Sequence, residues 1–383
     1  MNRQPNKIMI LYARFGEGHY QAASALRDSF ARLGNAEIML IDLLAESHPF
    51  INEFSRFVYR KSYTMWPQMY GWVYEATRGM KADSLFAHWL HSFGTVTMQR
   101  VVEREKPDAV IHTFPMMVMP TVTNRLRKKI PMFNVVTDFD LHMRWVHPDV
   151  DKYYVATEDM AEQLLNLGIT AERVAVTGIP IRSSFAPGRV HESAAFRYGL
   201  EPYRPTVLVM AGGYGALSGI RAAIRELTAG GKAQAAIVCG RNRLLEEELR
   251  RYYNGDSHIS VLGFIDRIDE LMGLASCIVT KPGGLTLSEA ICAGIPIVLY
   301  RPVPGQERNN ALYLQNKQAA VVCRTSSELL TAMTGILELP SLRLHLQSAV
   351  RKLRQENSSD RICLDILRQL NIMEEVSETP IPV

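Results

Sequence analysis

The sequence predicts an α/β fold with two successive doubly wound domains. A strand-like run at 7–12 (KIMILY) is followed by a glycine-containing loop, ARFGEG, and by a helical pattern from 19 to about 33. The same order recurs in the second half, where TVLVM at 206–210 precedes AGGYG and another helical stretch. A strand, a glycine loop and a helix in this order are typical of nucleotide-binding βαβ units. Two copies therefore predict two such domains.

Further short apolar runs supply the remaining strands that we expect. They lie at 109–113, 132–137, 152–156, 235–239, 259–262, 277–280 and 296–300. Such runs, bounded by turn or helical residues, are typical of buried parallel strands. The segment 185–205 is polar, contains prolines and lacks sustained periodicity, so we place the interdomain linker there. The expected domains are 1–187 and 188–365, followed by a helix end and frayed tail at 366–383.

Composition and charge limit the classes of function. Of 383 residues, 47% are hydrophobic, and 43 basic against 39 acidic residues leave a formal net charge of +4. This surplus is too small for a protein that coats nucleic acid, so we expect no nucleic-acid partner. The five cysteines form no CxxC pair and no zinc-ligand spacing, which favours a reducing cytoplasm. No apolar run reaches the roughly 18 residues of a spanning helix, so any membrane contact would be peripheral.

A glycine turn in the second half suits a phosphate group. The strand at 277–280 ends in KPGG (281–284) and opens a helix near Thr286. Backbone amides of glycine at the positive end of a helix can bind a diphosphate. Glu289 follows three residues after Thr286, which we take to be the first turn of that helix. It either caps the helix or accepts hydrogen bonds from ribose hydroxyls, and the residues alone favour capping. The polar pair at 306–307 follows the next strand, where side chains can reach sugar hydroxyls.

The first glycine loop supplies a candidate acceptor site. Gly16 and Gly18 permit close backbone approach to a ligand, and His19 begins a helix at the carboxyl end of the first strand. An imidazole with a pKa of about 6.5 can take a proton from an alcohol. The residues alone favour a histidine that orients substrate or caps its helix. Asp138 follows another buried strand at the same edge and could orient His19 or serve as the alternative base.

Four groups of motifs together resemble one family of glycosyltransferases. They are FGEGH (15–19), TDFDLHMRWVHPDVDKYYVAT (137–157), TGIPIRSSF (177–185), and KPGGLTLSEA with PVPGQE in the second half. Their combination is similar to the bacterial diacylglycerol glucosyltransferases and the plant monogalactosyldiacylglycerol synthases of glycosyltransferase family 28. The resemblance covers nearly the whole chain. It implies the GT-B fold, in which two doubly wound Rossmann-like domains face each other across a cleft.

The resemblance also implies roles for individual residues. Those expected to bind the UDP-sugar are Gly18, Arg182, Gly213, Phe264, Ile265, Gly283, Gly284, Leu285, Thr286, Glu289, Gln306 and Glu307. The loop 264–265 would hold uracil through backbone groups, and Glu289 would hold the ribose. Arg182 would contact the diphosphate, although its position also permits an interdomain salt bridge. His19 becomes the expected general base, with Asp138 as its partner or alternative.

The implied reaction is inverting transfer of glucose from UDP-glucose to diacylglycerol, which could be processive. The alternatives are galactose from UDP-galactose, N-acetylglucosamine transfer to a lipid-linked peptidoglycan precursor, and a non-catalytic UDP-sugar sensor. Hydrolysis or epimerisation of a UDP-sugar is a weaker choice. We expect no cofactor and no metal, and interpret the DxD pattern at 138–140 as coincidental because the helix end already supplies positive potential. The spacing of His142 and His147 is a weak ligand signal.

An aromatic and basic segment at 50–74 suggests contact with a membrane. It holds nine of the 32 aromatic residues, interleaved with three basic ones. Trp and Tyr favour the headgroup region, and Lys and Arg attract anionic lipid. A helical pair that packs its aromatic residues into the core is an equally good interpretation of the residues alone. We expect peripheral binding to anionic phospholipid at the cytoplasmic face of the cell membrane, through Arg56, Arg60, Lys61, Trp66, Tyr70 and Trp72.

Overall fold

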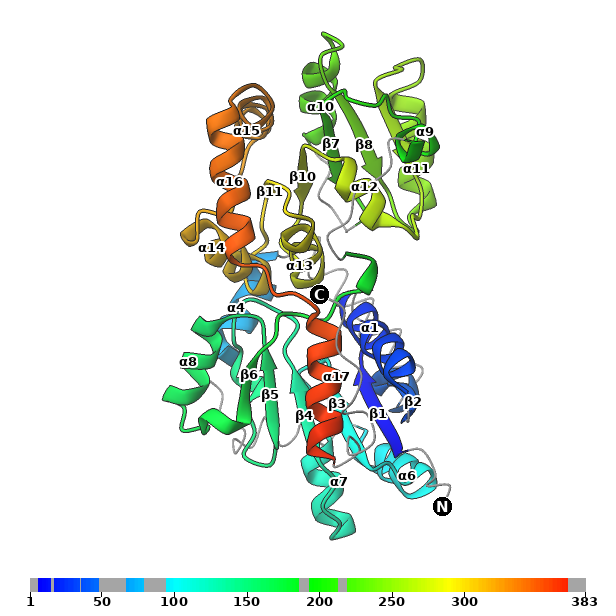
Figure 1. Cartoon of the computed structure of the whole chain (residues 1–383), viewed down its shortest axis with the longest axis vertical. Helices are drawn as coiled ribbons and strands as arrows, with labels where there is room; N and C mark the ends of the chain where they lie inside the picture. Colours follow the sequence, from blue (N-terminus) through cyan, green and yellow to red (C-terminus); the bar gives the residue numbers. More distant parts are fainter. Residues whose placement is uncertain are drawn as a thin grey trace. The chain divides into compact units, whose positions relative to one another are not determined.

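The computed structural model describes residues 6–14, 17–34, 36–47, 67–78, 94–185, 193–212 and 219–370. The chain divides into two units. The first contains Met1–Tyr59, Glu75–Ser183 and Gln355–Val383, and the second contains Arg60–Tyr74 and Ser184–Arg354. Each unit has one six-stranded sheet in which every neighbouring pair of strands is parallel, with helices on both faces (Figure 1). The predicted pair of doubly wound α/β domains is therefore confirmed.

The sheet of the first unit has the order β2-β1-β3-β4-β5-β6. Its strands are β1 (Asn6–Tyr12), β2 (Ala36–Asp42), β3 (Ala109–His112), β4 (Met132–Val135), β5 (Lys152–Val155) and β6 (Val174–Val176). Its helices are α1 (Glu17–Leu33), α2 (Leu43–Ser47), α6 (Thr95–Glu105), α7 (Met119–Leu126), α8 (Glu158–Asn166) and α17 (Ser358–Gln369). Helix α4 (Pro67–Arg78) is divided between the units, with residues 67–74 in the second and 75–78 in the first. From β1 the chain passes first to β2 on one side and later to β3 on the other. The topological switch point of this sheet therefore lies between β1 and β3.

Strand β1 is buried on both faces because its alternate side chains enter two separate cores. Ile8 and Ile10 pack with apolar residues of α1 and α17. Met9 and Leu11 pack with apolar residues of α2, α6 and α7. A strand covered on both faces needs apolar residues along its buried part, which explains why the residues after Lys7 (IMILY) lack the alternation of a half-exposed strand.

The C-terminal helix α17 packs in the first unit, although it follows the second unit in the sequence. It lies beside α1 (Figure 1), and its apolar face is buried in the core that contains Ile8. Asp365 anchors the helix to β5, because it accepts a hydrogen bond from Tyr154 Oη at 2.8 Å and lies 2.9 Å from Lys152 Nζ. The expected boundary at residue 365 does not account for this return of the chain, because it places most of α17 with the second domain.

The sheet of the second unit has the order β12-β11-β10-β7-β8-β9. Its strands are β7 (Thr206–Met210), β8 (Gln234–Val238), β9 (Ile259–Leu262), β10 (Cys277–Thr280), β11 (Ile297–Tyr300) and β12 (Ala320–Cys323). Its helices are α9 (Ser193–Arg197), α10 (Ile220–Thr228), α11 (Arg243–Tyr252), α12 (Ile268–Leu274), α13 (Gly284–Ala293), α14 (Gln306–Asn316), α15 (Ser326–Glu338) and α16 (Pro340–Lys352). The chain continues from β7 to β8 and β9 and then crosses to β10, so the switch point lies between β7 and β10.

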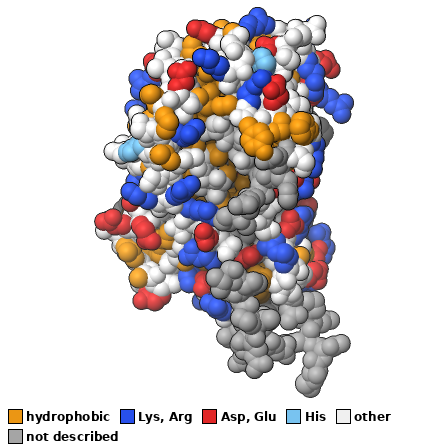
Figure 2. All heavy atoms as spheres, turned by 45° about the horizontal axis from the view of Figure 1, so that its top comes forward, with side chains coloured by type: hydrophobic (Ala, Val, Ile, Leu, Met, Phe, Trp, Pro, Cys, Tyr) orange, Lys and Arg blue, Asp and Glu red, His pale blue; other side chains and the backbone are white. Residues whose placement is uncertain are grey.

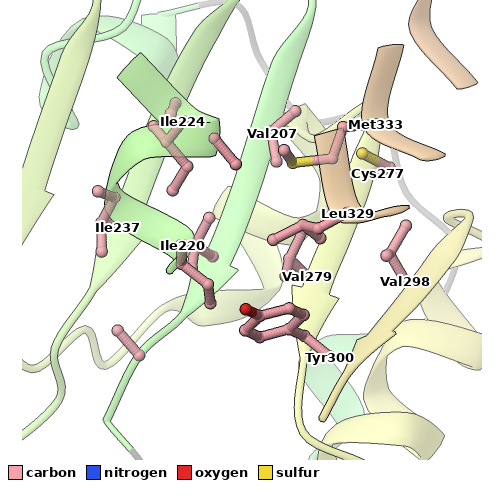
Figure 3. Packing of buried hydrophobic residues seen from close by; sticks show 14 of the residues in the cluster. Val207, Ile220, Ile224, Ile237, Cys277, Val279, Val298, Tyr300, Leu329 and Met333 are labelled. Carbon is pink, nitrogen blue, oxygen red and sulfur yellow. The ribbon is translucent and has the colours of Figure 1, made fainter. Parts of the chain in front are cut away.

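The core of the second unit joins its central strands to helices α10 and α15. Figure 3 shows the side chains that fill it, among them Val207, Ile220, Ile224, Ile237, Val279, Val298, Leu329 and Met333. The first strand, β7, and the crossover strand, β10, contribute to the same cluster. Their packing fixes the two strand ends on either side of the switch point.

The expected linker at 185–205 differs from the structure. Residues Ser193–Arg197 form helix α9, and Ala194 and Ala195 are buried. Tyr198 Oη then donates a hydrogen bond to Glu270 at 2.9 Å. Helix α9 has only five residues, or about one and a half turns, so it is too short to show the sustained periodicity by which a helix is predicted from sequence.

Charged side chains do not form one large basic field on the face shown in Figure 2, where Lys and Arg are interspersed with Asp and Glu. Within the described part of the chain, no helix is long and apolar enough to cross a membrane. The five cysteines are all buried and unbridged.

Candidate functional site

His19 lies in the first turn of α1, at the switch point between β1 and β3. Its Nδ1 is 2.8 Å from the carbonyl oxygen of Thr113, directly after β3, and 3.0 Å from Thr137 Oγ1, just after β4. A carbonyl oxygen only accepts hydrogen bonds, so Nδ1 carries the proton and donates it to Thr113. In the neutral ring the other nitrogen, Nε2, then holds the lone pair that a general base requires.

The surroundings of His19 favour the neutral imidazole. Burial lowers the pKa of His19 to about 4, and the hydrogen bond to Thr113 opposes this effect only in part. The ring packs edge-on against Phe114, with ring centroids 5.0 Å apart. The imidazole is therefore unprotonated at neutral pH and can accept a proton there.

The orientation of His19 comes from a group that the sequence did not reveal. Thr113 fixes the imidazole through its backbone carbonyl, and its own Oγ1 donates to the Leu11 carbonyl oxygen at 3.1 Å. Asp138 is buried next to Thr137 in the sequence, and its role beside His19 stays a prediction. Every residue has a backbone carbonyl, so this contact cannot be predicted from residue type. The only indication in the sequence was that the strand predicted at 109–113 ends there.

The loop that begins with the DxD pattern has structural contacts of its own. Asp140 Oδ1 accepts a hydrogen bond from Arg78 at 2.7 Å. His142 Nδ1 accepts from the Arg144 amide at 3.1 Å and caps a 3₁₀ turn, and His147 Nδ1 accepts from the Asp149 amide at 3.2 Å. Within the described ranges, no cluster of three or more His, Cys, Asp or Glu side chains could hold a metal ion.

The KPGG turn places the amino end of α13 at the carboxyl end of β10. Gly283 is the N-cap residue, and no side chain caps the helix there. The amides of 284–286 therefore have no intrahelical acceptor, which is the usual condition for anion binding. A Cβ built on Gly283 would meet no atom within 4 Å, so this side of the turn faces open space. The geometry suits a diphosphate at the switch point between β7 and β10.

Glu289 corrects one detail of the sequence interpretation. Helix α13 begins at Gly284, so Glu289 is its sixth residue and lies in the second turn rather than the first. It cannot cap the helix from that position, which removes the alternative that the residues alone favoured. Its side chain is nevertheless buried, as expected for a carboxylate that is held in place rather than solvated.

Helix α14 places Gln306 and Glu307 at the carboxyl end of β11. The helix begins at Gln306, after Gly305 in a conformation with φ +96° that favours glycine. Glu307 Oε1 lies 3.2 Å from Lys281 Nζ, and Glu307 Oε2 accepts from the Val303 amide at 3.4 Å. The predicted sugar-binding pair is thus joined by an ion pair to the strand end that carries the predicted diphosphate turn.

A second hydrogen bond joins the same two segments. Asn310 is fully buried, and its Nδ2 donates to the Pro282 carbonyl oxygen at 3.0 Å. The sequence interpretation named neither Lys281 nor Asn310 as a site residue. Lys281 is the first residue of the KPGG motif, which was a signal that could have been used, whereas Asn310 lies in a helix without any such signal.

The loop expected to hold uracil follows β9. Phe264 is 54% exposed, with the Arg241 guanidinium 4.9 Å from its ring centroid. Gly263 lies beside Glu246, since a Cβ built on it would be 2.6 Å from Glu246 Oε2. Strands β9 and β10 are three positions apart in the sheet, or about 14 Å at the usual strand spacing. The predicted donor contacts therefore all lie at the carboxyl ends of the strands of this sheet.

Of the remaining predicted residues, three are described in full: Arg182, Gly18 and Trp72. Arg182 lies half-buried in the loop after β6, and Gly18 lies in α1 next to His19. Trp72 lies in α4 and is 70% exposed. Tyr70 lies in the same helix, but its side chain is outside the described residues. Outside them as well are Gly213, Arg56, Arg60, Lys61 and Trp66.

Two Rossmann-like units, one with a half-buried histidine and one with an open glycine turn at its switch point, define a protein with the GT-B glycosyltransferase fold. The family model for monogalactosyldiacylglycerol (MGDG) synthase matches residues 19–181, and the model for the glycosyltransferase family 28 C-terminal domain matches residues 206–360. The chain belongs to this glycolipid glycosyltransferase family. The predicted family resemblance is therefore confirmed.

Curated relatives match almost the whole chain. The chain is 36% identical over 382 residues to the processive diacylglycerol beta-glucosyltransferase of Bacillus licheniformis, with 99% of both chains covered. It is 37% identical over 369 residues to the protein of the same name from Bacillus subtilis, with 96% of both chains covered.

Solved structures support the fold at lower identity. MnaA of S. aureus, in a co-structure with UDP, has a TM-score of 0.66 at 16% identity, with 99% of this chain and 100% of that chain covered. MurG of Acinetobacter baumannii has a TM-score of 0.60 at 16% identity, with 95% of this chain and 100% of that chain covered.

Proposed function

We propose that this enzyme is an inverting UDP-sugar hexosyltransferase that moves glucose from UDP-glucose to diacylglycerol, with His19 as the general base. The observation that carries the proposal is the hydrogen bond of 2.8 Å between His19 Nδ1 and the Thr113 carbonyl oxygen. It fixes the tautomer in which Nε2 can accept a proton. The pKa of about 4 keeps this nitrogen unprotonated at the pH of a cell.

The chemical step follows from these groups. The acceptor hydroxyl of diacylglycerol gives its proton to His19 Nε2 as its oxygen bonds to the anomeric carbon. The bond from that carbon to the diphosphate oxygen breaks, and its electron pair leaves with UDP. Attack from the face opposite the leaving group inverts the anomeric configuration and gives a β-glucoside. The amides of 284–286 stabilise the negative charge that develops on the diphosphate.

Glucose is the proposed donor sugar because the curated relatives are named beta-glucosyltransferases. Glu289 is proposed to bind the ribose, and Gln306 and Glu307 to bind the sugar hydroxyls. The glucolipid product still ends in hydroxyl groups, so the proposal includes further rounds of transfer, in line with the word processive in the relatives' names. Neither carboxylate nor amide distinguishes glucose from galactose by its type alone.

Peripheral attachment to an anionic membrane at its cytoplasmic face forms part of the proposal. Trp72 is 70% exposed in α4, a degree of exposure that is unusual for the largest apolar side chain. An exposed Trp is favourable at the headgroup region of a bilayer. Diacylglycerol resides in the membrane, and no helix in the described part of the chain could span it, so the proposal has the enzyme reach its acceptor from the surface.

A transfer assay tests the proposal directly. Labelled UDP-glucose and UDP-galactose are offered separately to diacylglycerol in vesicles with and without anionic phospholipid. The expected result is labelled glycolipid from UDP-glucose, formed faster on the anionic vesicles. Product from UDP-galactose alone would reassign the donor. UDP binding without any glycolipid would instead favour the peptidoglycan precursor as acceptor, or a UDP-sugar sensor.

The role of His19 has a matched control. His19→Ala should lower transfer by about 10²–10⁴-fold, the usual contribution of a general base, and leave UDP affinity unchanged. His345 is exposed on α16, and His345→Ala should leave transfer unchanged. Normal turnover of the His19→Ala variant would refute the assignment of the base.

A further inference from the structure

We propose that Lys281 is a positioning residue that holds the Glu307 carboxylate in the orientation needed to bind the donor sugar. The inference rests on the proposed function, because it assigns the sugar contact to Glu307. Lys281 directly follows β10, and Glu307 lies in the first turn of α14, after β11. Strands β10 and β11 are neighbours in the sheet, so the two residues extend from adjacent strand ends.

In the ion pair between these residues, the carboxylate side chain is largely buried and the lysine side chain is partly exposed. The Glu307 side chain is 10% exposed and the Lys281 side chain 36%, and Nζ lies 3.2 Å from Oε1. A carboxylate at such burial requires an opposite charge or several hydrogen bonds to stay in place. The Val303 amide contributes one hydrogen bond to Oε2. Lys281 supplies the opposite charge and, together with Val303, fixes the rotation of the carboxylate group.

The position of Lys281 is itself fixed by the segments around it. Asn310 Nδ2 donates to the Pro282 carbonyl oxygen, so α14 is bonded to the residue that follows Lys281. The backbone of the KPGG turn and the first turns of α14 are therefore held at two points, one neutral and one charged. The neutral bond sets the distance between the segments, and the ion pair orients Glu307.

A lysine before a glycine turn could instead contact the diphosphate directly. The two roles differ in which part of the donor they affect. A residue that orients Glu307 affects binding of the sugar and leaves binding of UDP alone almost unchanged. A residue that contacts the diphosphate affects UDP and UDP-glucose to the same extent. The ratio of the two dissociation constants therefore separates the roles.

Calorimetric titration of the full chain with UDP and with UDP-glucose provides the test. Lys281→Met should raise the ratio of Kd for UDP-glucose to Kd for UDP by about tenfold or more, the value of a hydrogen bond to a charged group. Lys281→Arg, which keeps the charge, should restore most of the ratio. Lys232 is exposed before β8, at the opposite edge of the sheet, and Lys232→Met is the matched control with no expected change. An equal loss for both ligands, or no change, would overturn the proposal.

The Glu307→Gln variant provides a second test, which remains valid even where the Lys281→Met variant fails to fold. It keeps the shape of the side chain and removes its charge, so it should raise the same ratio. In that background Lys281→Met should add less than about twofold, because the two residues act as one unit. Fully additive effects would refute the coupling. The wild-type titration and transfer assay come first, so a failure of UDP-glucose binding or transfer would identify an error in the proposed function rather than in the role of Lys281.

Discussion

The pH dependence of transfer should distinguish His19 from an ordinary solvent-exposed histidine. The profile of kcat/KM reports the pKa of the base in the free enzyme. Burial lowers the pKa of His19 to about 4, whereas an unperturbed histidine titrates near about 6.5. We therefore expect the acid limb of the profile near pH 4 to 5 and little loss of rate between about pH 7 and pH 5.5.

The size of the effect is large enough to measure. At pH 5.5 a histidine with a pKa of about 6.5 would be roughly 9% neutral, whereas one with a pKa of about 4 would be roughly 97% neutral. If the neutral fraction sets the rate, the two cases differ about tenfold at this pH. The donor does not contribute to this difference, because the diphosphate of UDP-glucose is esterified at both ends and keeps its negative charge throughout this range.

The assay is initial-rate transfer at low donor concentration from pH 4.5 to 8, on vesicles whose surface charge does not titrate in that range. Circular dichroism at each pH confirms that the protein stays folded. Replacement of Thr137 by Val removes the hydroxyl 3.0 Å from Nδ1 but leaves the Thr113 carbonyl, so the acid limb should stay within about one pH unit of the wild type. A limb centred near pH 6.5 in the wild-type enzyme would refute the lowered pKa of the base.

Two further predictions follow from the described contacts. The folded-state pKa of His19 lies below its unfolded value of about 6.5, so the unfolded chain binds the proton more readily. The free energy of unfolding should therefore fall as pH drops from about 6.5 toward about 4, by at most about 3 kcal/mol. Urea titrations of the His19→Gln variant should lack this loss. Gly283→Ala should weaken UDP binding by about tenfold with an unchanged unfolding midpoint, because its Cβ would enter the open space where the diphosphate is proposed to bind. Gly230→Ala, also in open space, is the control, and equal UDP affinity in the two variants would contradict the placement of the diphosphate.

Most of the fold was predictable from the sequence because its central strands are buried on both faces. The runs at 206–210, 259–262 and 277–280 match β7, β9 and β10 at both ends. Strands in such positions are continuous apolar segments, and glycine loops follow where a strand meets its helix. Burial on both faces thus leaves a strong signal in a single sequence.

The strands that the sequence did not reveal all lie at sheet edges. They are β2, β6 and β12, at three of the four edges of the two sheets. Every residue of β2 is partly or fully exposed, and β6 has three residues, all of them half-buried. Their residues are mainly apolar (AEIMLID, VAV and AVVC), and periodicity alone does not assign such short apolar runs to a strand or to a helix. The return of α17 to the first unit was equally hidden, because it depends on contacts between distant segments.

The candidate site was predictable where backbone geometry requires a particular residue type. Glycines at 283–284 indicated an anion site without any contact information, and the structure confirms that a helix begins there. The partners that orient the site residues gave no such signal. Thr113 contacts His19 through its carbonyl oxygen, and Lys281 pairs with Glu307 in the helix that follows the neighbouring strand. Such contacts depend on strand register, which a sequence pattern does not specify.

The switch points of the two sheets account for the proposed division of chemical roles. At each switch point, connections leave neighbouring strands toward opposite faces, so the carboxyl ends of those strands stay uncovered. In the first sheet, His19 of α1 lies at the carboxyl ends of β1 and β3, where partial burial keeps its imidazole neutral. In the second, the end of β10 presents helix amides that favour negative charge. Deprotonation of an acceptor and stabilisation of a diphosphate need opposite electrostatic environments, a desolvated ring and a polar helix end. A duplicated fold provides one uncovered strand end for each.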